Sequence, residues 1–174
     1  MLTLRLATEA DLPALRVMMA RAIAELQTAF LSPEQVEASK AVMGLDTQLI
    51  ADGCYFVAEI EGALAGSGGW SPRATLYGGD HSAGRGARML NPANEPARVR
   101  AMYTDPAHIR RGVGKAVLTA CETAARAAGF ARVELMATLA GEPLYAAAGF
   151  ESIERIEDSN GGIPVPLIRM GKAL

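Results

Sequence analysis

The sequence predicts one α/β domain with a mixed, partly antiparallel sheet. Three observations favour this fold class. The length of 174 residues fits one compact domain better than two. Apolar stripes at helical spacing alternate along the chain with short strand-like runs. Two of these runs are joined by a tight-turn pair and not by a helix, which makes them antiparallel neighbours. We therefore expect a single domain over residues 1–174, with an α+β arrangement rather than a doubly wound one.

Composition and charge exclude several classes of protein. Hydrophobic residues make up 50% of the chain and charged residues 21%, as in globular proteins and unlike disordered or fibrous ones. The formal charge of -2 supplies no field that would attract nucleic acid, so no nucleic-acid partner is expected. The chain reaches Glu9 and Asp11 before any apolar run of signal length, and no stretch approaches about 18 consecutive apolar residues. We therefore expect a cytoplasmic protein with no membrane partner.

The residues that most often bind metals are few and scattered. Cys54 and Cys121 lie in apolar segments without CxxC spacing, and His81 and His108 are the only histidines. Because a zinc site needs about four such ligands at short spacings, no metal site is expected.

The first third of the chain shows a strand and two helix starts. Residues 2–7 alternate between apolar and polar, and Thr8 with Asp11 forms an acidic variant of the capping box. The helix that follows carries apolar residues at helical spacing: Leu12, Leu15, Met19, Ile23 and Leu26. Ser32-Pro33-Glu34-Gln35 is a second capping box, and its helix is expected to end near Gly44.

A hairpin and a long loop follow. Residues 54–60 and 63–70 are strand-like, and Glu61-Gly62 suits a tight turn between them. Residues 71–96 contain many turn-forming residues and no periodic pattern. A loop of this length is either a ligand-facing segment or a plain surface excursion.

The second half of the chain again alternates strands and helices. Asp105-Pro106 ends one strand, and Gly129 and Gly149 end two helices. The expected elements are a strand at 98–104, a helix at 112–128, a strand at 131–137, a short helix at 142–148, and strands at 150–156 and 165–170.

The segment from Arg110 to Lys115 carries the clearest chemical signal. Its sequence, Arg-Arg-Gly-Val-Gly-Lys, joins a strand to a helix. Glycine lets the backbone approach a ligand, and the first amides of a helix have no internal acceptor. With its basic side chains the segment suits a diphosphate, although a tight turn with solvated basic residues would look the same.

Two well-known phosphate motifs do not fit this segment. A P-loop requires glycine where Ile109 stands and Ser or Thr where Ala116 stands. A dinucleotide-binding fingerprint requires a third glycine at the position of Val117.

The chain resembles the GCN5-related N-acetyltransferase family, whose phosphate loop reads [QR]-x-x-G-x-[GA] between a strand and a helix. Residues 110–115 look like that loop, with Ile109 in place of the opening Gln or Arg. The resemblance covers most of the chain. It includes the helix after Thr8, the hairpin over 54–70, the strand at 98–104, Leu144-Tyr145 and Gly149-Phe150.

This resemblance implies a fold and a set of cofactor contacts. The expected fold has mostly antiparallel strands, flanking helices, and a fourth and fifth strand that splay apart to admit the pantetheine arm of acetyl-CoA. No metal is implied. By correspondence, Met102, Tyr103 and Thr104 contact the arm and the acetyl group, and Arg110, Arg111, Gly112, Val113, Gly114 and Lys115 hold the pyrophosphate.

The implied reaction is transfer of an acetyl group to a primary amine, most simply that of a small molecule, by direct attack in a ternary complex. Tyr145 matches the tyrosine that protonates the departing sulfur, and a phenol with a pKa of about 10 suits an acid. A half-buried structural tyrosine is the alternative. A backbone amide near Met102 would stabilise the oxyanion.

The general base is not evident in the sequence. Where some relatives have a carboxylate this chain has Arg98, and no acidic residue lies between Ala97 and Thr104. A water relay, a residue of another segment, or His81 with a reference pKa near 6.5 would have to accept the proton.

Four residues are candidates for binding the acceptor: Trp70, Arg73, Tyr77 and His81. The two aromatic residues offer a wall to a substrate, and Arg73, together with Arg85, would attract a carboxylate. Core packing of Trp70 and solvation of the arginines are the alternatives.

Two other functions remain open at this point. Arg98 and Ile109 favour a non-catalytic acyl-CoA-binding module. A protein lysine or N-terminal acetyltransferase would use the same cofactor site. The resemblance also makes a homodimer possible, without indicating an interface.

Overall fold

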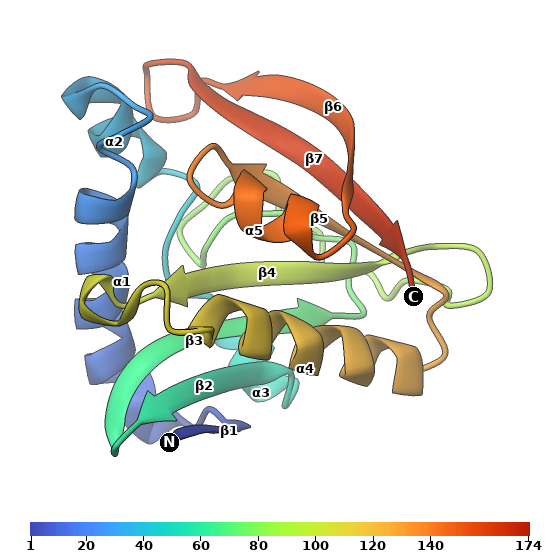
Figure 1. Cartoon of the computed structure of the whole chain (residues 1–174). Coiled ribbons are helices and arrows are strands. Elements are labelled where there is room, and N and C mark those ends of the chain that lie inside the picture. The colour runs from blue at the N-terminus through green and yellow to red at the C-terminus, as the bar shows by residue number, and fades with distance from the viewer.

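A computed structural model describes residues 1–174 as one seven-stranded sheet with helices on both faces (Figure 1). The strand order is β1-β2-β3-β4-β5-β7-β6. All neighbouring strands are antiparallel except β4 and β5, which are parallel. The predicted mixed, mostly antiparallel sheet is therefore confirmed.

Apart from α3 and the end of α2, the elements follow one another as the sequence predicts, with ends close to the expected ones. The strands are β1 (Leu2–Leu6), β2 (Tyr55–Ile60), β3 (Ala63–Ser71), β4 (Ala97–Thr104), β5 (Arg132–Thr138), β6 (Glu151–Asp158) and β7 (Val165–Ala173). The α-helices are α1 (Leu12–Leu26), α2 (Pro33–Ser39), α3 (Thr47–Ala51), α4 (Val113–Ala127) and α5 (Glu142–Ala147), and short 3-10 turns lie at Glu9–Asp11 and Pro106–His108. No helix has the length and apolar content that a bilayer-crossing segment requires.

The turns and caps expected from the sequence are present. Glu61 and Gly62 both have positive φ, 52° and 81°, as a tight hairpin turn between β2 and β3 requires. Ser32 and Gln35 form the reciprocal capping box of α2. The Thr8 amide donates to the Asp11 carboxylate at 2.8 Å.

Two expectations about the first helices were wrong. Helix α2 ends at Ser39 and not near Gly44, because the amides of Ala41 and Val42 bond to carbonyls three residues earlier, as in a turn. Helix α3 was not predicted at all. It has five residues and begins after Asp46, whose carboxylate accepts a hydrogen bond from the Gln48 amide. So short a helix shows no apolar period in the sequence.

The two faces of the sheet carry separate cores. Helix α4 packs on one face, over a core that includes Val99, Val117 and Leu135. Helices α1 and α3 pack on the other, where Tyr55 and Tyr103 are buried. In Figure 1, α4 lies in front of β3 and β4, α3 lies behind β2 and β3, and α1 lies at the left end of the strands.

Close packing between α4 and β3 depends on glycine. A Cβ atom at Gly66 would overlap the Val113 side chain, and one at Gly68 would overlap the side chains of Met102 and Val117. Since β3 presents no side chain at these two positions, the first turn of α4 lies directly on the sheet.

The parallel strands β4 and β5 separate after a short pairing. They are paired at Ala97 with Val133 and at Arg98 with Glu134, and at no later position. From there toward the end of β4 the two strands diverge, so β4 keeps a backbone edge without a strand partner. This is the predicted splay of the central pair.

Candidate active site

A cavity of about 110 Å³ lies where β4 and β5 diverge, and we call it the splay cavity. Its walls come from β4, β5, β7, α5, the loop at 72–96 and the segment at 42–44. Seventeen residues line it, of which twelve are hydrophobic. Arg100 is the one charged residue among them, and they include no Asp, Glu or His.

The β4 wall of the cavity contains a bulge. The β3–β4 register shifts between Ser67 and Gly69, and Ala101 has a positive φ of 51°. The Ala101 carbonyl accepts a hydrogen bond of 2.9 Å from the Tyr55 hydroxyl. A bulge re-aims the residues next to it, and here Ala101 and Met102 both face the splay cavity.

Tyr145 enters the cavity from α5. The ring is buried, with 7% of the residue exposed, and packs edge-on against Phe150 at 5.9 Å between ring centroids. Its hydroxyl makes no hydrogen bond within the chain, and burial raises the pKa of the phenol above its ordinary value. Tyr145 therefore presents a protonated, unpaired hydroxyl to the cavity.

The three residues predicted to contact the pantetheine arm and the acetyl group lie at the end of β4. Met102 and Tyr103 line the splay cavity and Thr104 does not. The Tyr103 hydroxyl accepts a hydrogen bond of 2.7 Å from the Gly44 amide. Burial raises the pKa of Tyr103 to about 12.

The Arg110–Lys115 loop leads from the end of β4 into α4 (Figure 1). Arg110 and Gly112 both have positive φ, 62° and 80°. The first hydrogen bond of the helix runs from the Ala116 amide to the Gly112 carbonyl. The amides of Val113, Gly114 and Lys115 therefore have no acceptor within the chain.

The side chains of this loop divide into an anchor and a basic surface. Val113 is buried against β3. Arg110, Arg111 and Lys115 are exposed beside the free amides. Free amides at the positive end of a helix dipole, with basic side chains around them, form an anion-binding arrangement.

The sequence matches the model of the acetyltransferase (GNAT) family over residues 20–150. The chain belongs to this GNAT family. It matches no curated protein. Many solved structures have the same GNAT fold as this chain, and they resemble it far more in structure than in sequence.

Three examples each match 99% or more of the chain. A GCN5-related N-acetyltransferase from Rhodopseudomonas palustris has a TM-score of 0.73 at 20% identity, with 99% of this chain and 95% of that one covered. The PaiA N-acetyltransferase of Thermoplasma acidophilum, in complex with coenzyme A, has a TM-score of 0.68 at 14% identity, with 100% and 99% covered. A ribosomal-protein-alanine N-acetyltransferase from Brucella melitensis has a TM-score of 0.66 at 21% identity, with 99% of each chain covered.

The four residues predicted to bind an acceptor lie in different places. Tyr77 lines the splay cavity, and its hydroxyl donates to Asp158 at 2.7 Å. The other three do not line it. Trp70 packs edge-on against Phe130 at 6.2 Å, Arg73 pairs with Asp52 at 2.7 Å, and His81 Nε2 lies 2.6 Å from the Lys40 carbonyl.

Arg98, at the position where some relatives have a carboxylate, takes part in an ion pair. Its guanidinium lies 3.2 Å from Glu134, and Glu134 also pairs with Arg169 at 2.6 Å. These contacts hold β4, β5 and β7 together at the point where β4 and β5 begin to diverge. No Asp, Glu or His lines the cavity in place of the missing carboxylate.

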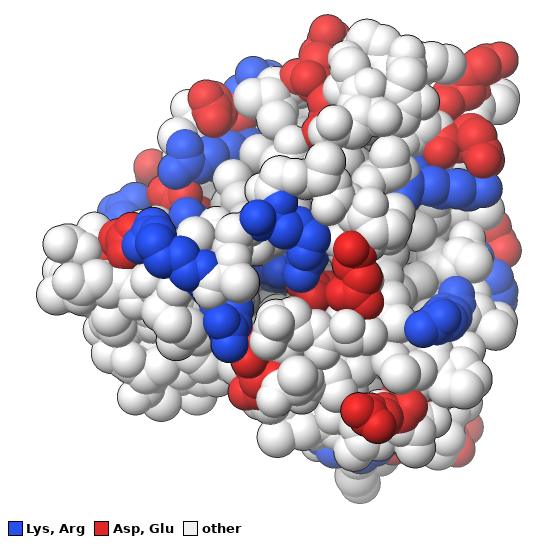
Figure 2. Space-filling view, turned by 180° about the vertical axis from the view of Figure 1, so that it is seen from behind, with Lys and Arg blue, Asp and Glu red and all other residues white.

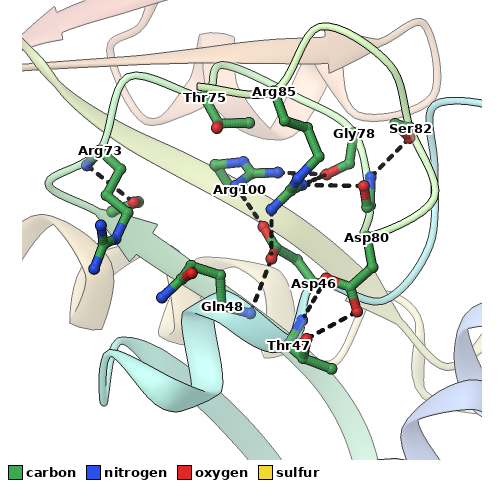
Figure 3. Close-up of polar contacts among 12 residues, drawn as sticks. Asp46, Thr47, Gln48, Arg73, Thr75, Gly78, Asp80, Ser82, Arg85 and Arg100 are labelled. Atoms are coloured by element: carbon green, nitrogen blue, oxygen red, sulfur yellow. Dashed lines mark hydrogen bonds and ion pairs between the residues drawn. The ribbon is translucent and has the colours of Figure 1, made fainter. Parts of the chain in front are cut away.

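Sequence reasoning missed Arg100. It lies two residues after Arg98 on β4, and Val99 between them points into the core under α4, so both arginines lie on the opposite face. The alternation of faces along a strand was the signal that could have placed Arg100 on the same face as Arg98. Arg100 contacts Asp46 and the Gly78 carbonyl, and Arg85 pairs with the same Asp46 at 2.9 Å (Figure 3).

These contacts hold the loop at 72–96 against the rest of the protein. The Thr47 hydroxyl donates to Asp80 at 2.9 Å, and Ser82 donates to the Ala41 carbonyl at 2.7 Å. With the Arg85–Asp46 pair they place the loop over one end of the splay cavity. On this face of the molecule, basic and acidic side chains lie close together (Figure 2).

Proposed function

We propose that this GNAT protein is an acetyl-CoA-dependent N-acetyltransferase, built as one domain, that acts on the primary amine of a small molecule. The observation that carries the proposal is the unpaired Tyr145 hydroxyl in the splay cavity. Strand β4 forms one wall of the cavity, and the Arg110–Lys115 loop with its free amides comes after the same strand in the chain.

The residues present fit acetyl-CoA. The amides of Val113, Gly114 and Lys115, with Arg110 and Arg111 beside them, would hold the pyrophosphate. Past Arg98, β4 has no strand partner on its β5 side, which suits an extended arm that itself carries amides. The coenzyme A in the PaiA structure supports this cofactor. When bound, acetyl-CoA supplies an activated acetyl group and a thiol leaving group.

This chain's residues have two roles in the transfer. The amide of Met102, beside the bulge, would donate a hydrogen bond to the carbonyl oxygen as negative charge develops on it. Tyr145 would donate its proton to the sulfur as the carbon–sulfur bond breaks and the nitrogen–carbon bond forms. The proton lost by the amine restores the phenol, so the products are an amide and a free thiol.

Burial raises the proton affinity of both partners in this transfer, the phenol and the departing thiolate. A phenol ordinarily holds its proton more tightly than a thiol does, with pKa values of about 10 and 8.5. Desolvation raises thiol pKa values as well, and burial raises the pKa of Cys54 in this protein to about 11. A thiolate leaving into the largely apolar splay cavity would gain proton affinity in the same way.

The residues that line the cavity decide whether the protein can supply a general base there. It includes no Asp, Glu or His, so the amine has no protein carboxylate or imidazole within the cavity to take its proton. We propose that the acceptor reacts from its uncharged form and that water relays the proton from the nitrogen to the Tyr145 oxygen, which restores the phenol. The reaction should then follow the ionisation of the acceptor itself.

The size of the cavity favours a small acceptor over a protein. The splay cavity holds about 110 Å³, and the loop at 72–96 lies over one end of it. The likeness to a ribosomal-protein-alanine N-acetyltransferase keeps a protein N-terminus as the second candidate. A peptide acceptor would require this loop to leave the contacts that Arg85 makes with Asp46.

The test is release of free thiol. Purified protein is titrated with acetyl-CoA in a calorimeter and is then given acetyl-CoA with a panel of small amines and short peptides. We expect binding heat, and thiol release with small amines in excess of that with peptides. Binding without turnover across the panel would identify a non-catalytic acyl-CoA-binding module, and no binding heat would refute the proposal.

A further inference from the structure

Arg100 is unusual among the residues that line the splay cavity. It is the one charged residue there, and its side chain is only 3% exposed. The other walls are mainly apolar, from residues such as Leu76, Met136 and Leu167. A buried guanidinium within an apolar lining is expensive unless it is compensated, so its partners decide what the cavity can bind.

The partners of Arg100 do not balance its charge. Arg100 and Arg85 share one buried carboxylate, Asp46, whose side chain has 0% exposure (Figure 3). Both guanidiniums also donate to the Gly78 carbonyl, which carries no net charge. Asp80, in the same loop as Arg85, is exposed and accepts from the Thr47 amide and hydroxyl at 3.0 Å and 2.9 Å. Two cations therefore meet one buried anion.

One donor of Arg100 is also unused. Its Nε atom is buried and has no hydrogen-bond partner, although Nη1 contacts Asp46 and Nη2 donates to Gly78. Burial, together with the nearby Arg85, lowers the pKa of Arg100 in spite of the Asp46 contact. Both observations show a guanidinium that lacks part of its compensation in the free protein.

We propose that the acceptor carries a carboxylate as well as its primary amine, and that Arg100 selects for it. The apolar remainder of the lining fits a compact apolar side chain, so the substrate class is an amino acid of this kind. The inference rests on the proposed function and deepens it. A carboxylate would supply the missing negative charge, and a charge-assisted hydrogen bond to arginine is among the stronger polar contacts.

The structure points to Arg100 for binding the carboxylate, and not to Arg73 or Arg85, which the sequence indicated. Arg73 pairs with Asp52 at 2.7 Å outside the cavity, and Arg85 pairs with Asp46 without lining it. Of the three, Arg100 alone lines the cavity.

The test compares acceptors that differ in the carboxylate alone. Native protein with acetyl-CoA is assayed with L-leucine and L-leucinamide, and with L-methionine and L-methioninamide. We expect kcat/KM for each acid to exceed that of its amide by about tenfold or more. The α-amino group of an amino-acid amide is less basic than that of the free amino acid, so a larger share of it is uncharged at a given pH. This difference by itself would make the amide react faster, which is the opposite of what the proposal predicts. An equal or faster rate with the amides would overturn it.

Variants of Arg100 separate selection from a purely structural role. Arg100→Met should raise KM for the acids and largely remove the acid-to-amide ratio while the amide rate persists, and Arg100→Lys should restore part of that ratio. Arg88→Met is the matched control, because Arg88 is exposed and pairs with Glu95 on the surface. An equal loss with acids and amides in Arg100→Met would overturn selection by this residue. Should that variant fail to fold, the ratio measured on native protein decides.

The two proposals fail in different ways. Thiol release with amines that lack a carboxylate, and none with the amino acids, refutes the carboxylate inference and leaves the N-acetyltransferase standing. Absence of thiol release with every amine refutes both.

Discussion

Replacing Tyr145 by phenylalanine removes one oxygen atom from the splay cavity and leaves the ring in place. The hydroxyl makes no hydrogen bond within the chain, and the ring keeps its edge-on contact with Phe150 at 5.9 Å. Since no hydrogen bond is lost, the free energy of unfolding should change by less than about 0.5 kcal/mol. Urea denaturation checks this expectation.

The effect on activity should be much larger. Loss of a general acid lowers a rate by roughly 10²–10⁴-fold, which is about 3–5 kcal/mol in the activation free energy. The affinity for acetyl-CoA should not change, because the pyrophosphate would be held by the amides of Val113, Gly114 and Lys115. Thiol release gives kcat and calorimetry gives the dissociation constant.

Tyr55→Phe is the matched control. The Tyr55 hydroxyl bonds to Ser67 and to the Ala101 carbonyl, each at 2.9 Å, and Tyr55 does not line the cavity. Its loss should cost about 1–3 kcal/mol of stability and lower kcat much less than Tyr145→Phe does. An unchanged kcat in Tyr145→Phe would remove this tyrosine from the mechanism, and equal losses in both variants would indicate a structural effect.

Three further outcomes are expected. Gly66→Ala should lower the free energy of unfolding by about 1–3 kcal/mol, because the new Cβ would overlap Val113. Gly86→Ala is the control and should change this free energy little, because the nearest atom to its new Cβ lies 3.7 Å away. Equal free energies of unfolding for the two variants in urea denaturation would contradict this prediction. Unfolded Tyr103 loses its proton near pH 10, but the folded protein keeps it to about 12. Stability should therefore fall by about 3 kcal/mol between pH 10 and 12, and Tyr103→Phe should show a shallower fall. The kcat/KM should rise with pH up to the acceptor's own pKa and should not fall before about pH 10, because burial raises the pKa of Tyr145; a bell-shaped profile centred near neutrality would show a titrating base that the cavity lining lacks.

Much of the local structure was predictable because it depends on neighbours in the chain. The Ser32 capping box joins residues three apart, and Glu61-Gly62 adopts the two positive φ angles of a tight turn. The Arg110–Lys115 loop is predictable for the same reason, since its free amides follow from where α4 begins. The five-residue helix α3 was not, because its one turn leaves no period to detect.

The sequence by itself determined the order of the elements, the anion-binding loop and membership of a family with a splayed central pair. The tertiary structure alone decided which side chains face the splay cavity. Arg100 meets Asp46 from a segment more than fifty residues earlier and meets Gly78 from the long loop, and no local pattern brings these three together. Whether these three residues meet depends on the order of the strands and on the face of the sheet that each residue of β4 occupies. Both are set by many contacts between distant parts of the chain, which form together as the sheet assembles.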